Sequence, residues 1–109
     1  MTVRLYVLQR ATAALMVPLI VIHLAVIFYA TRQGLSAADI LARTRGSFLW
    51  GGLYVLFVAC AAVHGAIGIR AVVREWIGLS ERALDALMWS LGTVFLVLGL
   101  RAVAAVVLS

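Results

Sequence analysis

The chain has 109 residues, of which 66% are hydrophobic, and its mean hydropathy is +1.17. A soluble domain of this size cannot bury so large an apolar fraction, so the composition excludes a soluble enzyme and indicates an integral membrane protein. The net charge of +5 comes from nine arginines and four acidic residues, nearly all in the tails and connections. That distribution is usual for a membrane protein and gives no case for nucleic-acid binding.

Three apolar segments are long enough to cross a bilayer. A transmembrane helix requires about 20 predominantly apolar residues, and segments 11–31, 48–69 and 83–108 meet this requirement. We therefore predict an all-α integral membrane protein in which residues 1–109 form one membrane domain with three transmembrane helices. Little chain is left for a soluble catalytic domain, so any chemistry is expected within the helical bundle or on subunits bound to it.

The connections carry signals for helix starts. Ser36 and Asp39 have the spacing of a capping box, which predicts a short interfacial helix before Gly46. In the second connection Ser80 can cap the third helix, and Glu81 suits the positive end of its dipole.

The first apolar segment is interpreted as a retained helix, because it is long and lacks the small-residue cleavage pattern of a secretory signal. No Ser-rich amphipathic leader precedes it, which favours a bacterial or archaeal cell membrane. Five of the nine arginines lie on the N-terminal side of the three spans, which favours a cytoplasmic N-terminus. These five are Arg4, Arg10, Arg70, Arg74 and Arg82.

His64 lies in the second apolar segment, where an unpartnered imidazole is energetically costly. Its neighbours three and four positions away are Cys60, Ala61, Ile67 and Gly68, three of which are small. Small neighbours leave room for another helix or for a flat macrocycle, and a neutral imidazole is a good axial ligand for haem iron. The residues alone leave two interpretations open, haem ligation and an interhelical hydrogen bond.

His23 in the first segment poses the same problem, but its helical neighbours are bulky. Counted at the helical rise from the nearest span ends, the two histidines should differ in depth by about 10 Å. One iron between them is therefore not expected. If both are ligands, each serves a different haem and takes its second ligand from another chain.

Two segments carry a resemblance to a known family: QRATAALMVPL at residues 9–19 and HGAIGIRAVVREW at residues 64–76. They resemble the small hydrophobic membrane-anchor subunit of succinate dehydrogenase, the D-type cytochrome b subunit of succinate:quinone oxidoreductases. The family pattern has Arg-x-Thr-Ala opening the first helix, His-x-x-x-Gly in the second, and an acidic residue followed by an aromatic one. The matching residues here are Arg10, Thr12, Ala13, His64, Gly68, Glu75 and Trp76.

The resemblance implies a role in the respiratory chain and the tricarboxylic acid cycle without catalytic residues on this chain. The protein would anchor a flavoprotein subunit with FAD and an iron-sulfur subunit, beside a second hydrophobic cytochrome b subunit. Electrons from succinate would reach a quinone near the cytoplasmic surface, with haem b nearby. His64 would be an axial haem ligand beside Gly68. Arg10 and Arg70 could pair with haem propionates, Arg10 being the better candidate by its position in the family pattern, or either could simply follow the positive-inside tendency.

The expected quinone site departs from the family pattern. Many members have Asp-Tyr where this chain has Glu75 and Trp76. The indole N–H of Trp76 can donate a hydrogen bond but cannot accept one, so it could perform part of the role of the tyrosine hydroxyl. Ordinary anchoring at the membrane interface is the alternative for Trp76. Arg74 and Glu75 are expected to line the entrance of the site or to face lipid headgroups.

The number of haems and the class of protein are left with alternatives. His23 and His64 together fit a complex with two haems, in which each membrane subunit offers one histidine from each of its first two helices; a hydrogen-bonded His23 fits one haem. A haem-free scaffold and the anchor of a fumarate reductase are the other interpretations. A small multidrug exporter is disfavoured, because that family is expected to have four spans and an acidic residue within the first.

Overall fold

The computed structural model describes residues 2–108, and nearly all of them are helical. The helices are α1 (Val3–Gln33), α2 (Ala37–Thr44), α3 (Phe48–Trp76) and α4 (Glu81–Val107), and residues 2–108 contain no strand. Helices α1, α3 and α4 are each long and apolar enough to cross a membrane. The expected all-α architecture with three spans is therefore confirmed.

The long helices extend beyond the apolar segments that predict them. Helix α1 begins at Val3 rather than near residue 11, and α3 continues to Trp76 rather than ending near residue 69. Hydropathy marks only the part of a helix that crosses the hydrocarbon, whereas the backbone hydrogen bonds continue into the interface. The bundle is 49 Å long, which matches a bilayer of about 40–45 Å with its headgroups.

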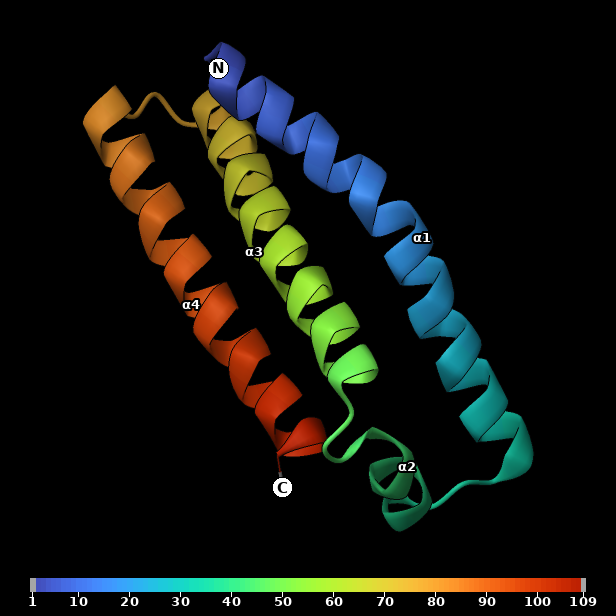
Figure 1. The fold of residues 1–109 in the computed structure, drawn as a ribbon. Helices are drawn as coiled ribbons and strands as arrows, with labels where there is room; N and C mark the ends of the chain where they lie inside the picture. Colours follow the sequence, from blue (N-terminus) through green and yellow to red (C-terminus); the bar gives the residue numbers. More distant parts are fainter. Residues whose placement is uncertain (1, 109) are drawn as a thin grey trace.

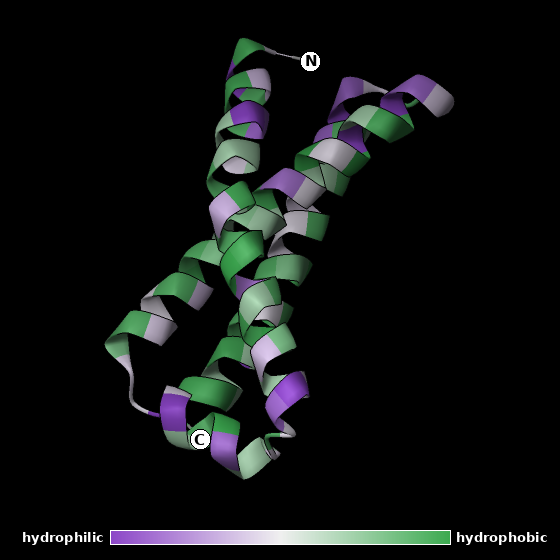
Figure 2. Cartoon of the chain, turned by 90° about the vertical axis from the view of Figure 1, so that its right-hand side faces the viewer, coloured by the Kyte–Doolittle hydropathy of each residue, from purple (hydrophilic) through white to green (hydrophobic). Residues whose placement is uncertain are grey.

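Helix α3 occupies the centre of the arrangement (Figure 1). Helices α3 and α4 form an antiparallel hairpin in contact along its length, and α1 packs against the other side of α3. The N-terminal part of α1 lies beside the C-terminal part of α3, and α1 then diverges toward its own C-terminus (Figure 1). Figure 2 shows hydrophilic residues gathered toward the two ends of the bundle, with hydrophobic residues predominating between them.

The predicted helix caps are present. The amide of Asp39 donates to Ser36 Oγ at 3.2 Å and the amide of Ser36 donates to Asp39 Oδ2 at 2.9 Å, which completes the capping box of α2. Ser80 Oγ accepts from the amide of Ala83 at 3.2 Å and caps α4. The short interfacial helix predicted before Gly46 is therefore confirmed as α2.

The α2–α3 connection also binds the C-terminal end of α4. Thr44 Oγ1 lies 2.6 Å from the carbonyl oxygen of Val106, and the amide of Gly46 donates to the carbonyl of Val107 at 2.7 Å. Gly46 has a φ of 71°, a left-handed conformation that glycine adopts without steric cost. These bonds satisfy carbonyls that a helix end otherwise leaves unpaired.

Candidate functional site

His64 faces the N-terminal part of α1. Its Nδ1 atom lies 3.3 Å from Thr12 Oγ1 and 3.3 Å from the carbonyl oxygen of Gln9. The side chain is half-buried. Within residues 2–108, Nε2 makes no hydrogen bond and is not among the fully buried unpaired atoms, so this nitrogen reaches the surface of the bundle.

Gly68 leaves space for the side chain of Gln9, one of the two α1 residues that meet His64. A Cβ atom at Gly68 would lie 3.3 Å from Gln9 Nε2, closer than ordinary van der Waals contact. Thr12 is 8% exposed and is one of the few buried residues of α1. The space at Gly68 is therefore occupied by a side chain of α1 of the same chain, at the contact between α1 and α3.

The surroundings of Nδ1 are polar and partly unsatisfied. Thr12 Oγ1 lies 2.7 Å from the carbonyl oxygen of Leu8 and 3.1 Å from that of Gln9. The side-chain oxygen of Gln9, Oε1, is buried and has no hydrogen-bond partner within residues 2–108. The sequence motif includes Thr12, but sequence reasoning assigned no role to either α1 residue. Gln9 and Thr12 meet His64 because of how α1 packs against α3, and this packing cannot be read from the sequence of either helix alone.

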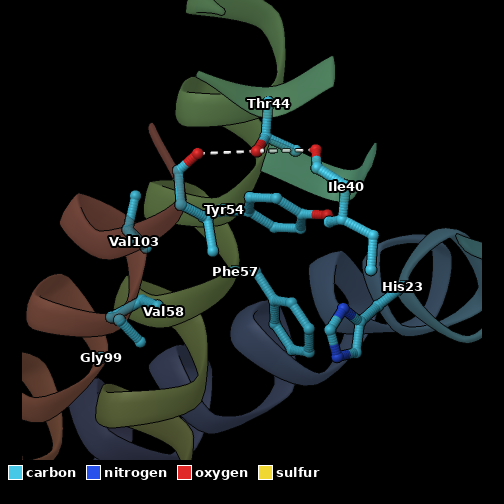
Figure 3. Close-up of a pocket in the computed structure, with 10 residues that line it drawn as sticks. His23, Ile40, Thr44, Tyr54, Phe57, Val58, Gly99 and Val103 are labelled. Atoms are coloured by element: carbon cyan, nitrogen blue, oxygen red, sulfur yellow. Dashed lines mark hydrogen bonds between the residues drawn. The ribbon is translucent and has the colours of Figure 1, made fainter. Parts of the chain in front are cut away.

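His23 lies in a different environment near the opposite end of the bundle. Its ring meets Phe57 edge-on at 5.2 Å and Tyr54 edge-on at 6.3 Å between ring centroids. It lines a cavity of about 340 Å³ among the four helices, together with Thr44 and other residues (Figure 3). Its Nδ1 atom is buried and has no partner within residues 2–108.

The structure does not bring the two histidines together. His64 contacts Thr12 of α1, and His23 lies further along the same helix, a separation of about 16 Å along the axis. This distance exceeds the difference of about 10 Å expected from the span ends, an expectation that treats the helices as parallel, whereas α1 diverges from α3 (Figure 1). A single iron cannot be shared between two imidazoles so far apart.

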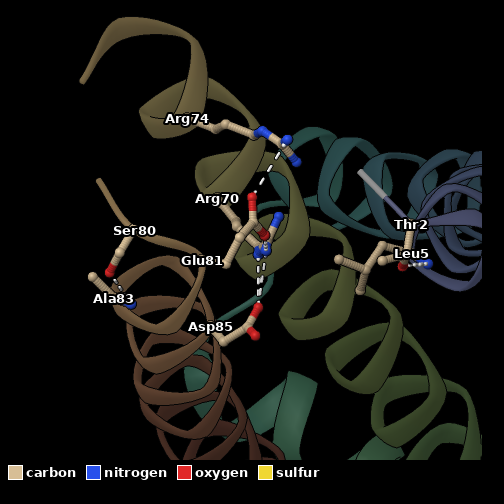
Figure 4. Close-up of polar contacts among 8 residues, drawn as sticks. All are labelled: Thr2, Leu5, Arg70, Arg74, Ser80, Glu81, Ala83 and Asp85. Carbon is tan, nitrogen blue, oxygen red and sulfur yellow. Dashed lines mark hydrogen bonds and ion pairs between the residues drawn. The ribbon is translucent and has the colours of Figure 1, made fainter. Parts of the chain in front are cut away.

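Arg70 and Arg10 lie in contrasting environments. Arg70 is 3% exposed and pairs with Asp85 at 2.9 Å and Glu81 at 2.8 Å (Figure 4). Arg10 is exposed, and its guanidinium carbon lies 5.8 Å from the centre of the Tyr6 ring. The charge of Arg70 is thus neutralised inside the α3–α4 hairpin, whereas Arg10 stays exposed at the surface of α1. Sequence reasoning missed this ion-pair cluster, although Glu81 and Asp85 share one face of α4.

Arg74, Glu75 and Trp76 lie at the C-terminal end of α3. Trp76 is 82% exposed, and Glu75 is exposed as well. Arg74 Nη2 lies 3.4 Å from Glu81 Oε1, so Arg74 extends the ion-pair cluster at the surface (Figure 4). The structure therefore places all three at the C-terminal end of α3. This chain can contact a ligand or another subunit there from one side only.

The chain was compared with known proteins. Residues 1–100 match the family model described as the succinate dehydrogenase/fumarate reductase transmembrane subunit. No curated protein and no solved structure matches the chain. The family match covers the motif around Arg10 and Thr12, the His64 region and most of α4. It agrees with the three apolar helices of a multi-pass membrane protein. The chain therefore belongs to the family of succinate dehydrogenase/fumarate reductase transmembrane subunits.

Proposed function

We propose that this chain is the haem b-binding membrane anchor of a succinate:quinone oxidoreductase in a prokaryotic cell membrane. It attaches the flavoprotein and iron-sulfur subunits to the membrane, beside a second hydrophobic cytochrome b subunit. It also supplies part of the site at which electrons from succinate reach quinone. The catalytic oxidation of succinate takes place on the partner subunits, and the N-terminus faces the cytoplasm.

The observation that carries this proposal is the environment of His64. A histidine that binds a metal through one ring nitrogen usually donates its other N–H to a protein acceptor, which orients the ring. His64 has this arrangement, because Nδ1 meets two oxygens of α1 and Nε2 reaches the bundle surface. The residues present therefore fit axial ligation of haem iron by His64 Nε2. The bound haem would supply one-electron redox chemistry.

The half-buried position of His64 also supports a second membrane subunit. Nε2 points away from the hydrogen bonds to α1, so a haem at this atom would lie between this chain and a neighbour. Large apolar side chains are exposed on all three long helices, including Phe28 of α1, Val72 of α3 and Val97 of α4. These surfaces suit lipid and helices of a partner cytochrome b subunit.

Arg10 is the preferred partner for a haem propionate. It lies on the helix that contacts His64, and it forms no ion pair within residues 2–108. The family position already favours Arg10 over Arg70, and the guanidinium of Arg70 binds two carboxylates of α4. A propionate at Arg70 would have to displace Asp85 or Glu81.

The quinone site is proposed at the C-terminal end of α3. Trp76 would donate its indole N–H to a quinone carbonyl, and Arg74 and Glu75 would line the entrance. The exposure of Trp76 supports this assignment, because its ring is available to a ligand enclosed by other subunits.

His23 is the candidate ligand for a second haem. Its Nδ1 atom is buried without a hydrogen-bond partner within residues 2–108, which supports the view that a group outside this chain binds His23. Against this, the Phe57 and Tyr54 rings already pack against the imidazole edge-on. The alternative to haem ligation is that His23 forms a hydrogen bond with a polar group within the helical bundle.

The haem b to flavin ratio of the purified complex tests the proposal. A ratio near two supports both histidines as ligands, and a ratio near one retains His64 alone. Replacing His64 with Gln should remove haem while the complex still assembles, as judged from its flavin content. His23→Gln makes the same chemical change at the other histidine: it should remove the second haem if His23 is a ligand, and should leave the haem content unchanged if it is not. If flavin is present and the wild-type complex carries no haem, the protein is a haem-free anchor and the proposal is wrong.

A further inference from the structure

Three oxygen atoms of α1 determine where the protons lie around His64. The shortest contact joins Thr12 Oγ1 to the Leu8 carbonyl oxygen at 2.7 Å. Two oxygens at this separation require a hydrogen between them, and a carbonyl has none to give. The Thr12 hydroxyl therefore donates to the backbone of its own helix, and its lone pairs face His64.

His64 Nδ1 thus meets two acceptors and no donor. One is Thr12 Oγ1, whose only proton is already used, and the other is the Gln9 carbonyl oxygen, each at 3.3 Å. An unprotonated Nδ1 would place its lone pair against both oxygens and would be repelled. A protonated Nδ1 donates to either of them.

We infer that helix α1 fixes the tautomer of His64, with the proton on Nδ1 and the lone pair of Nε2 directed out of the bundle. Thr12 is accordingly a positioning residue for His64. This inference rests on the proposed haem site, since the lone pair of Nε2 is the one an iron would take. It goes further by naming the α1 hydroxyl that tunes the ligand.

The hydroxyl acts on the electron density of the imidazole. A threonine oxygen that donates to a carbonyl becomes a better acceptor, because hydrogen bonds in a chain polarise one another. A stronger acceptor at Nδ1–H makes the imidazole a more basic ligand, which stabilises the oxidised iron relative to the reduced iron. Thr12 therefore lowers the midpoint potential of a haem at His64.

His23 has no such device. Its Nδ1 atom is buried without a hydrogen-bond partner in the part of the chain that the structure describes. Nothing on α1, α2 or α3 within this range selects one tautomer of His23. The two histidines therefore differ in their hydrogen bonding: within residues 2–108, acceptors face Nδ1 of His64, and Nδ1 of His23 has no partner.

The test is a redox titration of haem in the purified complex carrying Thr12→Val, which keeps the side-chain shape and removes the hydroxyl. The Gln9 carbonyl still accepts from Nδ1–H, so haem should remain bound. We expect the midpoint potential to rise, with the oxidised-to-reduced ratio at fixed ambient potential falling by up to about fivefold, the factor for one ordinary hydrogen bond. The low-spin ferric electron paramagnetic resonance signal should shift as well.

Two controls isolate the hydroxyl. Thr12→Ser keeps it and should retain the wild-type potential. Thr93→Val removes an exposed hydroxyl of α4 that bonds the carbonyl of Trp89 at 2.8 Å and makes no hydrogen bond to a histidine within residues 2–108. It should leave the haem unchanged. If Thr12→Val does not assemble, Thr12→Ala gives the same measurement with a smaller side chain.

The outcomes separate this inference from the proposed function. An unchanged potential and ferric signal in Thr12→Val or Thr12→Ala, with haem that is lost on His64→Gln, overturns the role of Thr12 and leaves His64 as ligand. Haem that survives His64→Gln unchanged removes the proposed haem site itself. If Thr12→Ser assembles and neither hydroxyl-free variant does, Thr12 is a structural residue of the α1–α3 contact, and the inference is also wrong.

Discussion

Arg70 of α3 and Asp85 of α4 are joined by two hydrogen bonds to one carboxylate oxygen. Arg70 Nε donates to Asp85 Oδ1 at 3.1 Å and Nη2 donates to the same oxygen at 2.9 Å. Nη2 also donates to Glu81 Oε2 at 2.8 Å. Arg70 is 3% exposed, whereas Asp85 and Glu81 are 54% and 62% exposed. The hairpin thus encloses a cation whose partners remain in contact with the surface.

This asymmetry predicts which partner tolerates replacement. Arg70→Met should be mild, because the methionine retains much of the apolar stem of the arginine and the released carboxylates are already largely hydrated. The double variant Glu81→Gln, Asp85→Asn should destabilise the subunit by about 1–3 kcal/mol, since it leaves the buried guanidinium without an anionic partner. Thermal unfolding of the purified complex measures both. Equal destabilisation by the two changes would contradict the interpretation.

Gly99 of α4 is predicted to be essential for the α3–α4 contact. A Cβ atom at Gly99 would overlap Val58 of α3, and even the rigid Val58 Cβ would lie at 3.2 Å. Gly99→Ala should therefore force the helices apart and cost about 1–3 kcal/mol. Gly52→Ala on α3 is the control, because a Cβ there meets nothing within 4 Å among residues 2–108. The yield and thermal stability of the complex should fall only for Gly99→Ala.

Thr44 is predicted to connect α2 to the end of α4. Thr44→Val keeps the side-chain volume but removes the hydroxyl that lies 2.6 Å from the Val106 carbonyl, which should cost about 1 kcal/mol. Hydrogen exchange at the amide of Gly46, which donates to the carbonyl of Val107, should become faster. Thr31→Val removes an exposed hydroxyl near the end of α1 and serves as control. If hydrogen exchange at the Gly46 amide is unchanged in Thr44→Val, the bond from Gly46 to Val107 is sufficient to attach the α2–α3 connection to the end of α4, and Thr44 is not required.

The start of α2 is predicted to respond to pH through Asp39. Bonds from the amide and then the hydroxyl of Ser36 lower the pKa of the Asp39 carboxyl below its ordinary 3.8, with a further contribution from Arg43. The folded carboxylate is favoured, so the capping contribution is complete above pH 3.8 and is lost as the pH falls through the lower folded-state pKa. Protection of the Ser36 amide from hydrogen exchange should decrease over that range.

Asp39→Asn provides the comparison for this pH effect. An amide at this position can still accept a bond from Ser36 but does not titrate, so its protection should be weaker at neutral pH and insensitive to acid. If the wild-type amide shows no additional loss of protection in acid relative to Asp39→Asn, the carboxylate does not cap α2.

The helices could be predicted from the sequence because their causes are local or compositional. Apolar runs of spanning length predicted α1, α3 and α4, and the Ser36–Asp39 spacing predicted α2. Helix ends were less accurate, as at Val3 and Trp76, because a helix outlasts its apolar stretch wherever interfacial residues continue the backbone bonds.

The sequence by itself determined that His64 is an ionisable residue in an apolar helix beside small neighbours, and a short motif suggested its family. It could not determine which atoms meet each ring nitrogen. Only the tertiary structure placed the Gln9 carbonyl and Thr12 at Nδ1, because that contact depends on how α1 crosses α3 at Gly68. The same holds for Arg70, whose partners come from another helix. Length and hydropathy determine whether a segment crosses the membrane, whereas the rotation and crossing of helices are set by packing between residues far apart in the chain.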